Sequence, residues 1–335
     1  MAQDRTPSPP PLRQRWLEQL HEEPLDPELT ICDPHHHLWE RPESHYLLPE
    51  LVADAESHNV VQTVFVECRS MYDRDRPEAL RPVGETAFVH NIALQTADGQ
   101  LRVAAGIVSH ANLTLGSAVD EVLEEHTRTS ANFRGIRHSA AWDASDALPF
   151  PRSSQGLLRD AKFREGFACL EKRGLTFDAW LYHPQLLELV DLARAFEGTT
   201  IVLDHVGGVL GLGPYAGKSE EIFEEWKRAM DELSSCPNVV VKLGGLTMPI
   251  CGFGFHERDV PPGSEELAEA LGPYYLFCIE RFGPERCMFE SNFPVDRASC
   301  AYGVLWNAFK RIAADFSAEE RAALFHDTAA RVYRL

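Results

Sequence analysis

Short apolar or β-branched segments alternate with longer amphipathic segments along most of the chain. Continuous apolar runs are typical of strands buried on both faces, and apolar residues spaced three or four apart are typical of helices. The strand-like segments cover residues 29–37, 60–68, 102–110, 133–141, 175–182, 199–208, 238–246 and 286–296. Helical spacing is found in residues 118–128, 157–174, 183–198, 220–236 and 265–283.

This alternation predicts an α/β fold in which a parallel sheet is covered by helices. Eight such units match a TIM-like (β/α)8 barrel better than an open, doubly wound sheet. The open sheet would usually carry a glycine-rich phosphate loop after its first strand, and "DPHHHLW" is not such a loop.

The first 28 residues differ in character from the rest of the chain. They begin with the proline-rich "TPSPPPLRQ" and continue into a short helical spacing of apolar residues that includes Trp16 and Leu20. We predict that residues 1–28 form an N-terminal extension packed on the outside of a barrel domain formed by residues 29–335.

Composition narrows the function classes. A formal net charge of −19 in 335 residues opposes binding to nucleic acid, which requires cationic side chains to neutralise phosphates. There is neither an apolar run of membrane-spanning length nor a secretory signal, so no membrane association is expected. The eight cysteines are scattered and contain no C-x-x-C pair, which favours reduced thiols and a cytoplasmic location. The expected partner is a small-molecule substrate, and a homodimer remains possible.

Polar residues recur where the predicted strands end, and in such barrels the chemistry lies at the carboxyl ends of the strands. We therefore expect these side chains to surround one site. They are His35, His37, Glu67, His110, Arg137, His138, Tyr182, His183, Asp204, His205, Lys242, Glu290, Asn292 and Asp296.

The triplet in "ICDPHHHLWE" is the most prominent of these features. Residues two apart on a strand share a face, so His35 and His37 would both point into the barrel mouth and His36 away from it. The segment "IVLDHVGG" places Asp204 and His205 at the end of a buried strand. Structural ion pairing within the barrel is the alternative explanation for the single charges Glu67, Arg137 and Lys242.

Four motifs together resemble the amidohydrolase superfamily. They are the Asp-x-His-x-His of the first strand, "GIR" in the fourth, "LDH" followed by glycine, and the terminal "SNFPVD". They are most similar to the amidohydrolase-related branch that includes sugar lactonases, 2-pyrone-4,6-dicarboxylate lactonase and some decarboxylases. The resemblance implies a distorted (β/α)8 barrel, with the family histidines at His35, His37 and His205 and the substrate-binding arginine at Arg137.

The last motif departs from the family pattern. Many relatives have "GSDWP", whose aspartate binds metal or acts as a base, whereas this chain has "ESNFP" with Asn292 at that position. An amide accepts no proton near neutral pH and is a poor zinc ligand. Glu290 and Asp296 are the nearest replacements. The cofactor is therefore either none or one divalent ion such as zinc, held by His35, His37 and His205.

We predict a hydrolase of a small carbonyl compound, most plausibly a lactone or cyclic ester bearing carboxylate or hydroxyl groups. His35, His37 and Arg137 would polarise the carbonyl, and His205 would activate water. Asp204, Glu290 or Asp296 would orient that histidine, and Asn292 would contribute a hydrogen bond. Further substrate contacts are predicted at Glu67, His138, Tyr182, His183, Trp39 and Tyr46. The alternatives are a metal-dependent decarboxylase of an aromatic or unsaturated acid and a barrel that only binds a small ligand.

Overall fold

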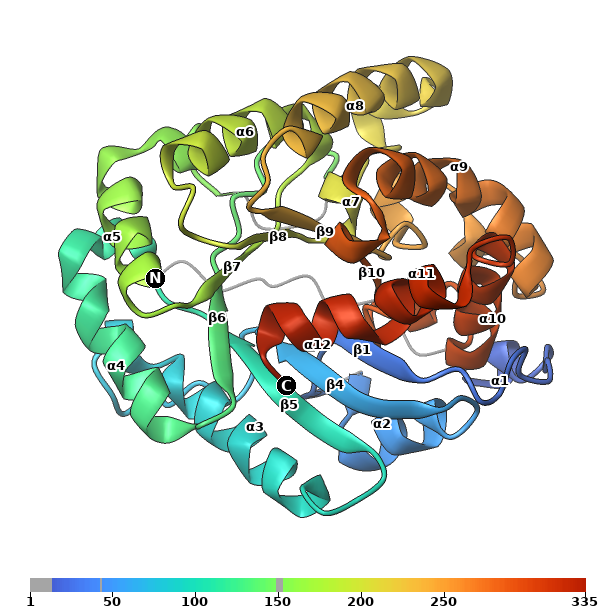
Figure 1. Cartoon of the computed structure of the whole chain (residues 1–335), viewed down its shortest axis with the longest axis horizontal. Coiled ribbons are helices and arrows are strands. Elements are labelled where there is room, and N and C mark those ends of the chain that lie inside the picture. Colours follow the sequence, from blue (N-terminus) through green and yellow to red (C-terminus); the bar gives the residue numbers. More distant parts are fainter. Residues whose placement is uncertain (1–13, 43, 149–152) are drawn as a thin grey trace.

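The structure, a computed structural model, describes residues 14–42, 44–148 and 153–335. Within these ranges eight parallel strands form one sheet, and their order in the sheet is their order in the chain (Figure 1). The strands are β1 (Ile31–His36), β4 (Val60–Val66), β5 (Arg102–Ser109), β6 (Phe133–Arg137), β7 (Thr176–Ala179), β8 (Ile201–Leu203), β9 (Val239–Leu243) and β10 (Cys287–Phe289). Each lies in one of the eight predicted strand segments, and the predicted (β/α)8 barrel is confirmed.

The barrel closes through the residues that follow its last strand. β10 ends at Phe289, and the contact with β1 is a single parallel bridge between His36 and Phe293. The amide of Asn292 donates to the carbonyl of His35 at 2.9 Å, and the amide of His37 donates to the carbonyl of Phe293 at 2.8 Å. Asn292 has a left-handed backbone, with φ 56°, so the chain leaves the regular strand geometry here. This irregular closure is the distortion that the family resemblance implies.

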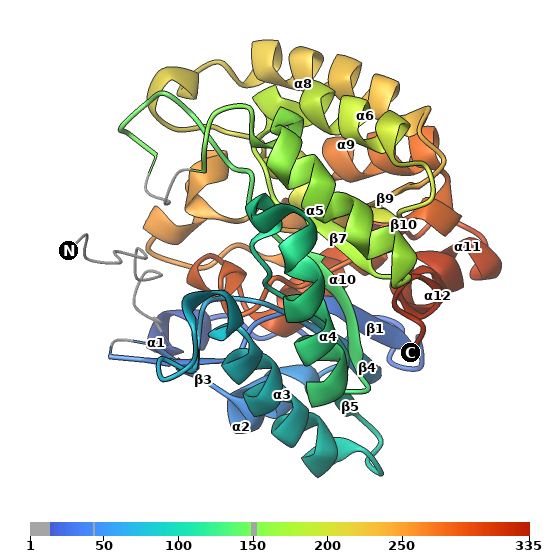
Figure 2. The same cartoon turned by 90° about the vertical axis from the view of Figure 1, so that its left-hand side faces the viewer.

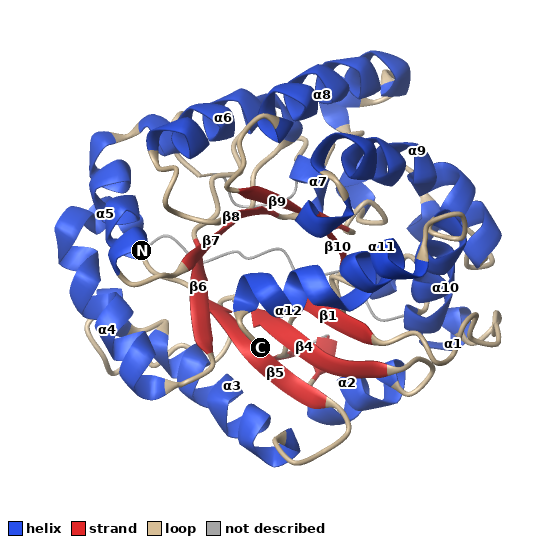
Figure 3. Cartoon of the chain, viewed as in Figure 1, coloured by secondary structure: helices blue, strands red, loops and turns tan. Residues whose placement is uncertain are grey.

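Helices form an outer layer around the sheet (Figures 1 and 3). The longer ones are α2 (Leu48–Ala55), α3 (Val83–Thr96), α4 (Val119–Thr129), α5 (Ala161–Lys172), α6 (Leu186–Ala195), α8 (Ser219–Ser234), α9 (Ser264–Phe282) and α10 (Tyr302–Ile312). Shorter elements are α1 (Gln14–Leu17), α7 (His205–Gly208), α11 (Ala318–Ala322), α12 (Thr328–Tyr333) and an antiparallel pair of β2 (Trp39–Arg41) and β3 (Ser44–Tyr46). The predicted helical segments contain α5 and α6, and they match α4, α8 and α9 to within one residue at one end. They do not include α2, α3 or α10.

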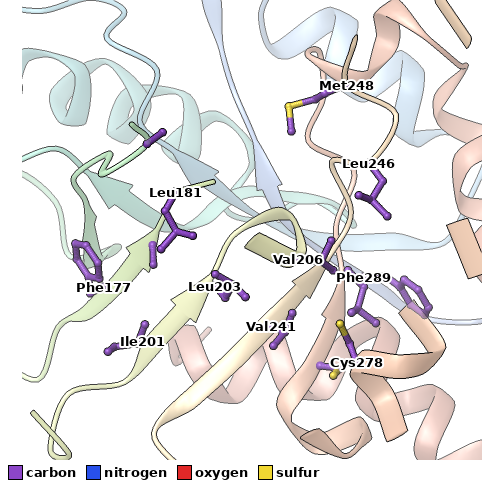
Figure 4. Packing of buried hydrophobic residues seen from close by; sticks show 14 of the residues in the cluster. Phe177, Leu181, Ile201, Leu203, Val206, Val241, Leu246, Met248, Cys278 and Phe289 are labelled. Carbon is purple, nitrogen blue, oxygen red and sulfur yellow. The ribbon is translucent and has the colours of Figure 1, made fainter. Parts of the chain in front are cut away.

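Apolar side chains fill the layer between the strands and the helices. In the part shown in Figure 4, Phe177, Leu203, Val241 and Phe289 come from successive strands, and Val241 and Phe289 lie near Cys278 of α9. Because this removes large aliphatic and aromatic surfaces from water, it supplies the main driving force for folding.

The inside of the barrel is filled at one end by α12, which lies across the strands in Figure 1 and is seen nearly end-on in Figure 2. Val332 and Tyr333 pack against the inner residues of the strands, among them Val64 and Val240. Gly106 of β5 makes room for this packing, since a Cβ there would lie only 2.9 Å from a methyl carbon of Leu335. The polar site therefore occupies the opposite end.

The described part of the predicted N-terminal extension packs against α10 and the loop before α9. The Trp16 indole donates to the carbonyl of Arg258 at 2.9 Å. Lys310 of α10 donates to the carbonyl of Leu25 at 2.6 Å, and Asn307 accepts from the amide of Leu25. Residues 1–13 of that prediction lie outside the described residues. Over the described ranges, no helix is both long and apolar enough to cross a membrane.

Asp33 of β1 holds the closure together. One carboxylate oxygen accepts from the amides of Ser291 (3.0 Å) and His35 (3.3 Å). The other accepts from the Ser291 hydroxyl (2.6 Å) and the Tyr302 hydroxyl (3.1 Å). The side chain is fully buried, so four donors depend on an acceptor that water cannot replace.

We expect Asp33→Asn to lower the free energy of unfolding by about 2–4 kcal/mol, because the amide nitrogen cannot accept and leaves two buried donors unpaired. Tyr302→Phe is the matched control: it removes one bond without orphaning a donor and should cost about 1 kcal/mol. Urea unfolding of the two variants measures both values. Equal losses would show that Asp33 does not carry the closure.

Candidate active site

The Glu290 carboxylate lies between two histidine rings at the carboxyl end of the barrel. Its Oε1 is 2.6 Å from Nδ1 of His205, and its Oε2 is 2.7 Å from Nδ1 of His35. Since an ionised carboxylate only accepts hydrogen bonds, the His205 ring carries a proton on Nδ1. Nδ1 of His35 faces the Lys242 ammonium as well, at 3.3 Å. Burial would raise the pKa of Glu290, but the charges and hydrogen bonds of His205 and His35 outweigh it and lower the pKa to about 2. Glu290 is therefore ionised at neutral pH.

The backbone around His205 orients its ring towards Glu290. His205 follows Asp204 directly after β8 and has φ 54°, a left-handed conformation that non-glycine residues seldom adopt. Gly245, after β9, faces its ring so closely that a Cβ there would lie 2.4 Å from the ring. The indole of Trp180 packs edge-on to the ring at 5.0 Å. Within the described ranges His205 Nε2 has no hydrogen-bond partner, so one nitrogen of an oriented imidazole is left for chemistry.

Arg137 of β6 joins the other side of His35. Its Nη1 lies 3.2 Å from Nε2 of His35 and 3.5 Å from Oδ2 of Asp204. Its Nε donates to Glu67 Oε1 at 3.0 Å, and its Nη2 donates to the carbonyl of Glu67. A guanidinium has five N–H groups, so these contacts leave one on Nη2. Arg137 is thus both a structural ion pair and a cation with a remaining donor at the site.

Lys242 of β9 provides the second buried cation. Its ammonium lies 2.7 Å from Asp178 Oδ2 and 3.2 Å from Asp204 Oδ1. Tyr333 of α12 donates to the same Asp178 oxygen at 2.6 Å. Burial raises the pKa of Asp178, whereas for Asp204 the charges of Lys242 and His35 overcome burial and hold its pKa well below the usual range.

His37 lies beside this group but in a different tautomeric setting. Its ring is 4.9 Å from the His35 ring, and Nδ1 is 2.7 Å from the carbonyl of Val66. Because a carbonyl only accepts, Nδ1 carries the proton and Nε2 keeps a lone pair. Trp39 stacks on the ring at 5.8 Å. Burial lowers the pKa of His37 well below its ordinary value, so the ring is neutral. This tautomer does not suit the carbonyl polarisation predicted for His37.

Asn292 and Asp296 form a separate pair. The Asn292 amide donates to Asp296 Oδ1 at 3.4 Å, and the left-handed backbone at Asn292 means that it does not continue the inner face on which Glu290 lies. Burial, the main cause, and the charge of Glu290 raise the pKa of Asp296 to about 7, although the His205 charge opposes them. Within the described chain, Asp296 Oδ2 has no hydrogen-bond partner.

The remaining predicted contact residues are tied to the protein in various ways. Tyr46 donates to Asp54 at 2.9 Å, and the Tyr182 amide donates to the side chain of Gln185 at 3.2 Å. His183 accepts from the amide of Leu210, and His138 from the amide of Leu113, both at 3.2 Å. The structure therefore groups His35, His37, Glu67, Arg137, His205 and Glu290, and it gives Tyr46 and Tyr182 partners outside that group.

A metal could be considered for one group of potential ligands. Ligand atoms of His35, Asp204 and His205 all lie within 4.8 Å of one another. However, both ring nitrogens of His35 face other side chains, and Asp204 already faces the protein cations Lys242 and Arg137. In this arrangement the group does not fit a resident divalent ion, which would have to displace those contacts.

Sequence reasoning did not single out Asp178 or Tyr333. Asp178 is one polar residue within an apolar strand, and Tyr333 lies at the end of the last helix. The signal for Asp178 was available, since a lone carboxylate in a buried strand needs a cation, and Lys242 was the only strand lysine in a comparable apolar run. Nothing in the sequence placed Tyr333 near them.

Comparisons with known proteins agree with this architecture. The amidohydrolase family model matches residues 32–335. The uncharacterized protein y4mH of Sinorhizobium fredii is 33% identical over 330 residues, which cover 92% of this chain and 99% of that protein. L-fucono-1,5-lactonase of Burkholderia multivorans is 30% identical over 253 residues, which cover 75% of this chain and 77% of that enzyme.

A crystal structure of an amidohydrolase from Burkholderia multivorans with bound zinc has the same fold. It aligns with a TM-score of 0.73 at 24% identity and covers 91% of this chain and 99% of that one. With the family model matching nearly the whole barrel and with relatives of this similarity, the chain belongs to the amidohydrolase family and is a hydrolase.

Proposed function

We propose that this enzyme hydrolyses the ring ester of a small lactone, with His205 as the group that moves the proton. The observation that carries the proposal is the 2.6 Å contact between His205 Nδ1 and the ionised Glu290. In the neutral ring this contact places the proton on Nδ1 and leaves Nε2 with a lone pair, as a general base requires. The lactonase relative of Burkholderia multivorans supports the choice of a lactone as the ester.

The proton path follows from this arrangement. Water held at His205 Nε2 attacks the lactone carbonyl carbon while its proton passes to Nε2. Glu290 then faces an imidazolium and stabilises it, in the manner of a carboxylate behind a catalytic histidine. When the carbon–oxygen bond of the ring breaks, Nε2 returns the proton to the departing alkoxide, which becomes the hydroxyl of a hydroxy acid.

The oxyanion of the tetrahedral intermediate needs a donor, and Arg137 supplies it. The remaining Nη2 hydrogen belongs to a guanidinium that is held on two sides by Glu67 and His35, so it is oriented before substrate arrives. Burial would lower the pKa of Arg137, but the charges of Glu67 and Asp204 raise it above its ordinary value. The cation is thus permanent, and His35 serves to position it.

A metal-dependent reaction would differ from the mechanism proposed for His205 and Arg137, which uses no metal ion. If a divalent ion were bound by His35, Asp204 and His205, it would polarise the carbonyl or acidify water. The ion pairs that Lys242 and Arg137 make with Asp204 favour the mechanism in which the protein's own cations do this work.

We expect His205→Asn to lower kcat/KM for lactone hydrolysis by about 10²- to 10⁴-fold, because asparagine can keep a donor to Glu290 but has no Nε2. His90→Asn on α3 is the matched control. His90 contacts Ser130 at 3.1 Å, away from the site, and its loss should leave kcat/KM unchanged. A His205→Asn enzyme with near-normal turnover would rule out the proposed base.

Exhaustive dialysis against a chelator should leave lactone turnover intact, and elemental analysis should find far less than one equivalent of zinc or manganese. The reason is that protein cations already occupy the contacts of Asp204. Near-stoichiometric metal whose removal abolishes turnover and whose return restores it would contradict the metal-free mechanism and favour the decarboxylase.

Asp296 should give the stability of the protein a distinct pH dependence. Its pKa is raised from 3.8 to about 7, so between these values the folded state holds a proton that the unfolded state has released. The free energy of unfolding should therefore fall as pH rises through this window. Asp296→Asn removes this slope. Measured by urea unfolding, the free energy of unfolding of the variant should therefore rise relative to that of the wild type between pH 4 and pH 8. Parallel plots of the free energy of unfolding against pH for the two proteins would contradict the raised pKa of Asp296.

A further inference from the structure

Two further histidines lie at the carboxyl ends of neighbouring strands, next to Arg137. His110 follows β5 and His138 follows β6, and their rings meet nearly at right angles with centroids 5.2 Å apart. Both are half-buried, unlike the fully buried His126 nearby. The mechanism above uses neither of them.

The backbone holds the two rings in opposite tautomers. His110 Nδ1 lies 3.0 Å from the carbonyl of Arg137, so it must donate, and Nε2 keeps a lone pair. The amide of Leu113 donates to His138 Nδ1 at 3.2 Å, so the proton of that ring is on Nε2. Burial lowers the pKa of both rings, to about 3 for His138, and so both are neutral at pH 7.

A structural histidine in this region looks different. His126 uses both nitrogens, with Nδ1 at 2.8 Å from the Thr86 hydroxyl and Nε2 at 3.0 Å from the carbonyl of His110. By contrast, the Nε2 atoms of His110 and His138 have no hydrogen-bond partner within the described ranges. The pair therefore carries one fixed acceptor and one fixed donor, with His110 bonded to the backbone of Arg137 and His138 packed against Phe163.

Such a pair matches hydroxyl groups. A hydroxyl can give its hydrogen to His110 Nε2, and a neighbouring hydroxyl can accept from His138 Nε2. A carboxylate in the same place has no hydrogen to give, so it leaves the lone pair of His110 Nε2 unpaired, although Arg69 and Arg137 bring positive charge to these rings. A site whose polar groups pair with substrate hydroxyls discriminates strongly against a ligand that leaves those groups of the protein unpaired.

We propose that His110 and His138 form a hydroxyl-binding pair that determines specificity: the enzyme selects lactones with neighbouring uncharged hydroxyls over lactones with a second carboxylate. This rests on the lactone hydrolysis proposed above. The pair binds substrate and takes no part in the proton transfers.

The test uses His110→Asn and His138→Asn in the full-length enzyme. Asparagine can keep the anchoring bond that each ring makes through Nδ1, as a donor at 110 and as an acceptor at 138, while the Nε2 group is deleted. Each variant and the wild type are assayed on hexono-1,5-lactones, on unsubstituted δ-valerolactone and on 2-pyrone-4,6-dicarboxylate. Each substitution should lower kcat/KM for the best hydroxylated lactone by about tenfold, and leave that for δ-valerolactone unchanged.

The outcomes separate the two proposals. Equal losses on the hydroxylated and unsubstituted lactones would show a structural role, and wild-type preference for the dicarboxylate would overturn the specificity. If the wild type hydrolyses no lactone, the proposed function fails, and calorimetry with hydroxylated 1,5-lactams against 2-piperidone then tests the pair alone. The hydroxyl-binding pair is supported if the wild type binds the hydroxylated lactams more tightly than 2-piperidone and if each asparagine variant weakens that binding about tenfold. Equal affinities of the wild type for the hydroxylated lactams and 2-piperidone would overturn it.

Discussion

The shared carboxylate of Glu290 is the contact on which the site depends. A buried anion is stable only if charge and hydrogen bonds compensate it, and here the compensation comes from two histidines, one on β1 and one two residues after β8. This requirement explains the unusual local features around it: the left-handed backbone of His205, the absence of a side chain at Gly245, and a chain that turns away after Glu290. The proton on Nδ1 of His205, and so the lone pair left on Nε2 of its neutral ring, follows from the same contact.

Around Glu290, buried charges link most of the strands. Glu67, Arg137, Asp178, Asp204 and Lys242 come from five different βα units and meet within one network. Burying so many charges brings little net stability, because the cost of removing them from water offsets their attraction. What the network provides is orientation, since each cation is held by at least two acceptors. In the proposed mechanism these ion pairs also orient the groups that the reaction uses, so ion pairing and function are compatible for Glu67, Arg137 and Lys242.

The eight strands and five of the longer helices could be predicted because their apolar spacing follows directly from their burial. The site could be predicted only in part. The identity of His35, Arg137 and His205 was visible, whereas the role of each ring depends on which backbone carbonyl or amide meets Nδ1, as at His37 and His138. The different settings of Glu290 and Asn292 could not be predicted from their spacing, because β10 ends at Phe289 and the backbone at Asn292 is left-handed.

The position of α12 couples the two ends of the barrel interior. Asp178 receives its hydroxyl partner from Tyr333, and the inner apolar residues receive their cover from the same helix. Asp178 in turn accepts from Lys242, whose ammonium also faces Asp204. A substitution that displaces α12 would therefore disturb the ion pairs of the polar end together with the apolar packing of the other end.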